Sequence, residues 1–76
     1  MVEVDFVYEV LVFKTDLDLS KEYVIRQLLS VFAEIEAVDF DFEDCDNILR
    51  VEALKDIAPE IEVLLNSKGF YCEEIQ

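Results

Sequence analysis

The chain has 76 residues, of which 54% are apolar, and its 19 acidic and 6 basic residues give a formal charge of −13. This length fits one domain, and the high apolar content excludes a disordered chain, in which high charge accompanies low hydrophobicity. So few Lys and Arg residues disfavour binding to nucleic acid or to an anionic membrane, because phosphate groups are held mainly by those side chains. We expect a single domain over residues 1–76, for which a basic partner or a cation is electrostatically suited. The same acids also keep a small apolar domain soluble.

The sequence lacks the features of export and of membrane insertion. Residues 1–5 include two acids where a secretory signal peptide carries basic residues. No apolar run reaches the roughly 20 residues that a membrane-spanning helix needs. Cys45 and Cys72 are the only cysteines, too few for a disulfide scaffold. The sequence therefore predicts a cytoplasmic protein with reduced thiols.

The first half of the chain predicts a strand followed by a helix. Residues 3–14 alternate in the manner of a strand, and both faces are apolar toward its end, which is typical of a central strand. Asp18 or Ser20 can cap a helix over residues 21–34. The apolar positions of that helix recur at helical spacing. They are Val24, Leu28, Val31, Phe32 and Ile35, widened by Ile25 and Leu29.

The second half predicts a hairpin, a helix and a last strand. Residues 37–42 and 48–54 alternate as strands around an acidic turn, with Leu49 and Val51 facing inward. A second helix begins near Asp56, carries Pro59 in its first turn and ends before Gly69. Its predicted buried stripe is Ile57, Ile61, Leu64 and Leu65, and residues 70–75 form the last strand. The order β-α-β-β-α-β predicts an α+β, ferredoxin-like fold with a four-stranded antiparallel sheet and both helices on one face.

Several segments resemble the heavy-metal-associated domain of copper chaperones and metal-ATPase modules, over about residues 11–75. The segments are Phe13-Lys14-Thr15-Asp16-Leu17, Val38-Asp39-Phe40-Asp41-Phe42, Ile48-Leu49-Arg50-Val51-Glu52 and Gly69-Phe70. That family binds metal through a Cys-x-x-Cys pair between its first strand and first helix. Alignment on Phe13-Lys14-Thr15 places Leu19 and Glu22 at those positions, and neither can replace a thiolate for Cu(I). The resemblance implies the fold without thiolate metal binding.

Two further groups of residues could take a metal, and this is the alternative function. Carboxylates stand in the first loop (Asp16, Asp18) and around the hairpin turn (Asp41, Glu43, Asp44, Asp46). They could hold Ca²⁺ or Mg²⁺ weakly, or simply be solvated loop charge. Cys45 and Cys72 lie next to opposite edges of the predicted sheet, so a shared metal or a disulfide is disfavoured. The other interpretation makes Cys72 a small buried side chain and Cys45 a turn residue.

The remaining residues predict a binding protein without a cofactor. The chain has no His and no Gly-rich phosphate loop, and no serine has a candidate base beside it. We therefore expect no enzymatic activity. Tyr8, Val10, Val12 and Ile48 should project from the open face of the sheet, where an apolar patch would mark contact with a protein partner or with a second copy of the chain. The alternative is that these residues only favour strand formation on a solvated face.

Overall fold

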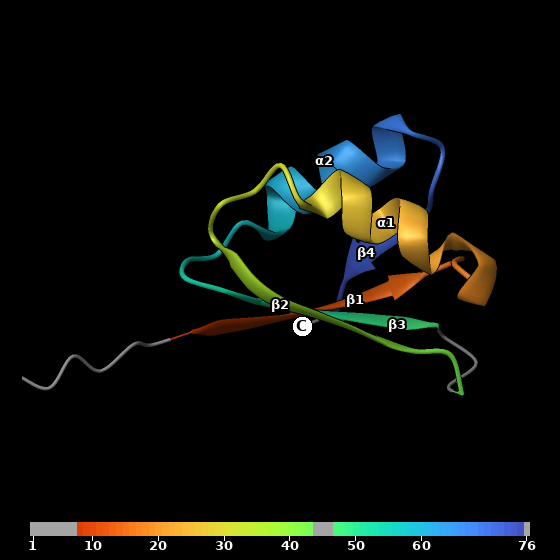
Figure 1. The fold of residues 1–76 in the computed structure, drawn as a ribbon, viewed down its shortest axis with the longest axis horizontal. Coiled ribbons are helices and arrows are strands. Elements are labelled where there is room, and N and C mark those ends of the chain that lie inside the picture. Colours follow the sequence, from red (N-terminus) through yellow and green to blue (C-terminus); the bar gives the residue numbers. More distant parts are fainter. Residues whose placement is uncertain (1–7, 44–46, 76) are drawn as a thin grey trace, which may run out of the picture.

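The computed structural model describes residues 8–43 and 47–75 (Figure 1). Its elements are, in chain order, β1 (Glu9–Thr15), a short 3-10 turn η1 (Leu19–Lys21), α1 (Glu22–Leu29), β2 (Ile35–Asp41), β3 (Ile48–Ala53), α2 (Ala58–Ser67) and β4 (Cys72–Glu74). The predicted β-α-β-β-α-β order is confirmed. The part of the first predicted strand that precedes residue 8 lies outside the described residues.

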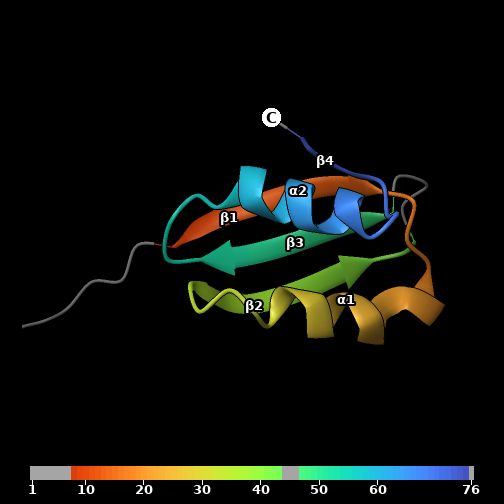
Figure 2. The same ribbon diagram turned by 90° about the horizontal axis from the view of Figure 1, so that it is seen from above.

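The four strands form one antiparallel sheet in the order β2-β3-β1-β4. β1 pairs with β3 from Glu9 to Lys14, whereas the short β4 pairs only with Phe13 to Thr15. Both helices cover the same face of the sheet and run alongside one another in opposite directions (Figure 2). The other face carries no helix among the described elements, as expected for a ferredoxin-like fold.

The core lies between the sheet and the two helices. It consists of Leu11, Phe13, Leu17, Ile25, Leu29, Leu49, Val51, Ala53, Ile57, Ala58, Ile61, Leu65 and Cys72, each at most 3% exposed. On the sheet side, the cluster is formed by alternate residues of β1 and β3. On the helix side, it is formed by residues four positions apart on each helix. Full burial of one large apolar side chain contributes about 1.5–3 kcal/mol, so this cluster is the main source of stability.

The first helix is shorter and turned differently than the sequence predicts. α1 ends at Leu29, and three-residue backbone bonds such as Phe32 N–H to the Leu29 carbonyl (3.1 Å) replace helix over residues 30–34. Ile25 and Leu29 face the core, whereas Val24 and Val31 are 42% and 71% exposed. The predicted stripe is therefore wrong at Val24 and Val31, whereas Leu28, Phe32 and Ile35 pack against the core as predicted. The apolar band of α1 is wider than the face that the sheet can cover, so periodicity alone could not select the buried edge.

The ends of the other elements follow local chemistry. Asp56 Oδ1 accepts a hydrogen bond from the Ala58 N–H (3.0 Å) and so caps the start of α2, where Pro59 occupies the first turn, as predicted. Gly69 has φ +88° and ends α2 in the left-handed region, also as predicted. β2 begins at Ile35, two residues earlier than expected, because a bulge lies between Ile35 and Ala37.

Candidate interaction surface

The open face of the sheet is built from alternate residues of neighbouring strands. Three rows cross β1, β3 and β2: Val10–Glu52–Ala37, Val12–Arg50–Asp39 and Lys14–Ile48–Asp41. Side chains that stand opposite each other in an antiparallel sheet are about 5 Å apart. The apolar residues of β1 on this face, Val10 and Val12, therefore stand beside charged residues of β3 and β2.

The predicted apolar patch is smaller than the sequence implied. Tyr8 is 42% exposed and Val10 59%, and Val12 is half-buried, but Ile48 is only 6% exposed. The prediction that Ile48 is exposed is wrong. Ile48 is buried although Arg50 and Glu52, on the same face of β3, are exposed, and Val10 lies on the part of β1 beyond the stretch that β4 covers. The accessible apolar surface is thus concentrated at Tyr8 and Val10.

Carboxylates outnumber cations on this face. Its charged positions are Asp39, Asp41, Glu52 and Glu73 against Lys14 and Arg50. A shallow depression of about 90 Å³ lies beside Val10 and is lined by Ala37, Asp39, Arg50 and Glu52 as well. An acidic face with an apolar spot favours ligands that combine Lys or Arg with apolar side chains.

The acids of the first loop make hydrogen bonds within the protein. Asp16 Oδ1 accepts from the backbone N–H of Tyr71 (3.0 Å) and so ties the loop to the segment before β4. Asp18 Oδ1 accepts from the backbone N–H of Ser20 (3.0 Å) and from the Ser20 hydroxyl, which together start η1. The hydroxyl bond is the main reason that the pKa of Asp18 lies below its usual value. Both predicted loop carboxylates therefore contribute to the conformation of the loop.

The two residues aligned with the family's thiols, Leu19 and Glu22, do not form a pair of metal ligands. Leu19 is 71% exposed, and Glu22 pairs with Arg26 on the next turn (3.1 Å). Within residues 8–43 and 47–75, no group of three or more His, Cys, Asp or Glu side chains could hold a metal ion. Asp44, Cys45 and Asp46 of the predicted hairpin cluster lie outside the described residues, so a site involving Cys45 stays a prediction.

Cys72 is a buried free thiol on β4. It is 3% exposed and stands opposite Thr15 on the side of the sheet that faces the helices. Burial, with smaller contributions from Glu62 and Asp16, raises the pKa of Cys72 to about 12. The thiol is therefore protonated at neutral pH, whereas metal binding and nucleophilic attack need the thiolate.

The buried thiol makes stability depend on alkaline pH. In the unfolded chain Cys72 loses its proton near its ordinary pKa of 9.0, but in the folded protein it keeps the proton until about pH 12. Higher pH therefore favours the unfolded state. In a Cys45→Ser background, we expect the free energy of unfolding to fall between pH 9 and pH 10.5, measured by urea denaturation. The matched Cys72→Ser variant should show a smaller fall, and equal slopes would contradict the buried position of the thiol.

A second apolar surface, not predicted from the sequence, lies on the helical side. A groove of about 500 Å³ is lined by Phe32, Pro59, Glu60, Val63, Leu64 and Ser67, and we call it the helix groove. Val63 is 69% exposed, and Phe32 and Leu64 are partly buried. The sequence contained two indications of this groove. α1 has more apolar positions than one face can bury, and Val63 lies outside the stripe formed by Ile57, Ile61 and Leu65.

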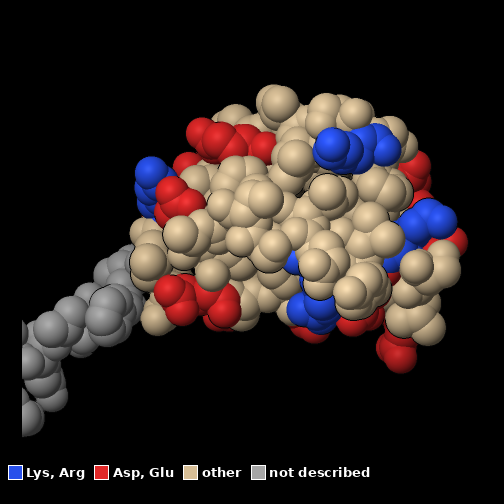
Figure 3. All heavy atoms as spheres, turned by 45° about the horizontal axis from the view of Figure 1, so that its top comes forward, with Lys and Arg blue, Asp and Glu red and all other residues tan. Residues whose placement is uncertain are grey.

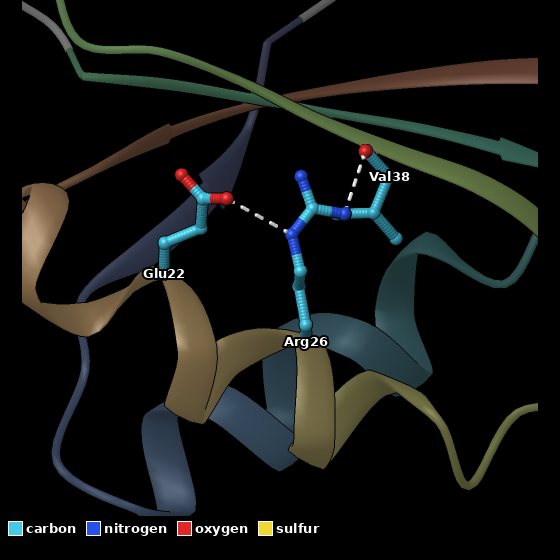
Figure 4. A network of polar contacts seen from close by, with 3 residues as sticks. All are labelled: Glu22, Arg26 and Val38. Carbon is cyan, nitrogen blue, oxygen red and sulfur yellow. Dashed lines mark hydrogen bonds and ion pairs between the residues drawn. The ribbon is translucent and has the colours of Figure 1, made fainter.

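Arg26 of α1 reaches the backbone of the edge strand β2 and so joins the helix to the sheet (Figure 4). Its Nε bonds to Glu22 Oε2 (3.1 Å), and its Nη1 donates to the Val38 carbonyl oxygen (3.0 Å). The guanidinium carbon lies 5.2 Å from the centre of the Phe40 ring, which stacks on Phe42 at 5.4 Å. Arg26 thus has three partners that hold it in place, and it is best explained as a structural link between helix and sheet.

Comparisons with known proteins yield no relative of this chain. No family model, no curated protein and no solved structure matches it. In the part of the chain that the structure describes, no helix is long and apolar enough to cross a membrane. The case for a function therefore rests on the surfaces described above.

Proposed function

We propose that this chain is a non-enzymatic binding module that engages a protein partner through the open face of its sheet. The observation that carries the proposal is the exposure of Tyr8 and Val10 beside three carboxylate-bearing rows. Apolar contacts give such a surface its affinity, and the charges around them select the partner. The buried free thiol of Cys72 is compatible with a reducing compartment such as the cytoplasm.

The charge of the module favours a basic partner over a second copy of the chain. A face-to-face dimer would oppose Asp39, Asp41, Glu52 and Glu73 to the same four acids, and each copy carries a formal charge of −13. Like charges brought together in this way cost free energy. A partner surface with Lys or Arg around an apolar residue would instead be attracted by these acids, so the electrostatic contribution to binding becomes favourable. The resemblance to heavy-metal-associated domains supports the same proposal, with the fold kept and the thiol pair absent from the loop.

The proposal predicts a specific loss of binding when Val10 becomes Lys. As a probe we choose a short peptide in which Val and Lys take turns at every second position with Thr between them. Residues two apart in an extended chain share a face, so apolar and basic side chains meet the sheet together. In ¹H–¹⁵N NMR titrations the wild type should show shifts in β1, β3 and β2. Val10→Lys removes apolar contact and adds a like charge to the peptide, so we expect affinity to fall about tenfold or more.

Val24→Lys is the matched control, because it makes the same change at an exposed position of the helical side. It should retain most of the affinity. Shifts confined to the helices, or equal losses in both variants, would contradict a site on the sheet. Sedimentation equilibrium without peptide tests whether the wild type forms a dimer. A stable dimer that Val10→Lys dissociates would mean that the sheet face binds a second copy of the chain and not a basic partner.

A further inference from the structure

We infer that the helix groove is a second docking site, on the opposite side of the molecule from the sheet face, and that it receives an amphipathic helix of a partner whose flanking residues are basic. The module would then bridge two partners. This inference does not depend on the proposed function of the sheet face. It is carried by the shape and lining of the groove, by the apolar residues around it and by the charge at its rim.

The groove has the lining expected of a protein contact. Of its six lining residues, Glu60 alone is ionisable, and Phe32, Val63 and Leu64 present apolar side chains. Figure 3 shows an uncharged area in the middle of the helical side, with both acidic and basic side chains around its border. A contiguous apolar surface of this kind on a small domain marks a contact site more often than single exposed residues do.

α1 extends this surface beyond the groove. Val24, Leu28 and Val31 are spaced four and three residues apart, so they share one side of the helix and of the turn that follows it. Val24 and Val31 are 42% and 71% exposed, and Leu28 is half-buried. The core is already closed by Ile25 and Leu29. Leu28 also packs against the core, so Val24 and Val31 are the members of this row that are available to a ligand.

A helix fits this site better than an extended strand. The groove is lined by α2 and by Phe32 of the turn that follows α1, and it includes no strand to whose edge an incoming strand could bond. A strand placed there would leave its own N–H and C=O groups facing an apolar wall, and each unpaired group is costly. A helix satisfies its backbone internally and can pack a row of side chains three and four residues apart against the outer side of α2 and Phe32.

Charge selects a foreign helix with basic flanks. Glu60 stands in the groove itself, and the chain carries 19 acids against 6 basic residues. The same groove on a second copy would bring Glu60 and the other acids of that copy into the contact. A Lys or Arg on the partner helix can instead pair with Glu60 at the rim, where the apolar surroundings strengthen the attraction.

The test uses a labelled model helix of about 14 residues with Leu on one face and Lys on the other, long enough to be helical when bound. Fluorescence anisotropy measures its affinity for the full chain. Val63→Asp removes apolar surface and adds a negative charge, so general attraction to an acidic protein predicts tighter binding. The groove predicts the reverse, a fall of about tenfold or more. Glu60→Gln should weaken binding severalfold and reduce its dependence on salt.

Leu19→Asp is the matched control, because it places the same charge at a comparably exposed apolar position that lies in neither proposed surface. It should leave the affinity unchanged or slightly raised. Binding that tightens in both Asp variants, or that is insensitive to Val63→Asp, overturns the groove. A dimer of the wild type that Val63→Asp dissociates, together with no binding of the peptide, also overturns it. None of these outcomes alters the test of the sheet face, which uses a different peptide and a different variant.

Discussion

Replacing Phe13 with Ala should remove most of the stability of the domain. Phe13 is completely buried on β1, between β3 and β4, in one cluster with core residues of both helices. Loss of a buried Phe side chain costs about 3–5 kcal/mol, because its transfer free energy is lost and a cavity remains. Small domains are stable by roughly 5–15 kcal/mol in total. We expect urea denaturation followed by circular dichroism to show a much lower midpoint, or a chain already partly unfolded in buffer.

Val10→Ala provides the control on the same strand. Val10 is 59% exposed, so its truncation should change the free energy of unfolding by no more than about 0.5 kcal/mol. A Phe13→Ala variant that loses less than about 1 kcal/mol would mean that Phe13 is not at the centre of the core.

Replacing Thr15 with Val should cost about 1–3 kcal/mol although the two side chains have the same shape. Thr15 is buried at the end of β1, and its hydroxyl makes two hydrogen bonds. It donates to the carbonyl oxygen of Asn47 (2.6 Å) and accepts from the backbone N–H of Leu17 (3.1 Å). Val leaves both backbone groups without this partner in a buried place. The bond also joins the first loop to the residue that precedes β3, so the loss should loosen both segments.

Thr15→Ser separates the hydroxyl from the rest of the side chain. It keeps both hydrogen bonds and removes one methyl group, so it should cost less than Thr15→Val in urea denaturation. Amide hydrogen exchange at Leu17 gives a local measurement, since its N–H should exchange faster in the Val variant and not in the Ser variant. Equal costs for the two variants would show that packing, rather than the hydrogen bonds, makes Thr15 important.

The strands and their faces were predictable because strand side chains alternate strictly between the two faces of a sheet, so the apolar set identifies the inward face. Leu49 and Val51 face inward, as the sequence indicates, and Gly69 takes the left-handed conformation that its place after α2 requires. α1 was less predictable. Its apolar residues cover more than one face, so periodicity allowed either Ile25 and Leu29 or Val24 and Val31 to face the core. Only the position of the sheet beneath the helix decides between them.

The candidate surfaces were predictable in part for the same reason. Val10 follows from strand alternation, but alternation gives only the face on which a residue lies and not how far its neighbours cover it, so the burial of Ile48 was not predicted. The helix groove depends on how α2 lies beside the turn that follows α1, and its residues come from segments about 30 positions apart in the chain. Asp16 looked like a candidate ligand for a cation, yet it accepts a hydrogen bond from Tyr71, 55 residues away.

The contact between Arg26 and Val38 bears on how the protein behaves at high concentration. β2 is an edge strand of the sheet, and the outer backbone groups of an edge strand can recruit a strand from another molecule and begin a growing aggregate. Arg26 occupies one of the acceptors on β2, and its guanidinium lies over the Phe40 ring. A cation placed there makes the edge a poor template for an incoming chain. One side chain of α1 thus both fastens the helix to the sheet and covers a backbone acceptor on one of its two edge strands.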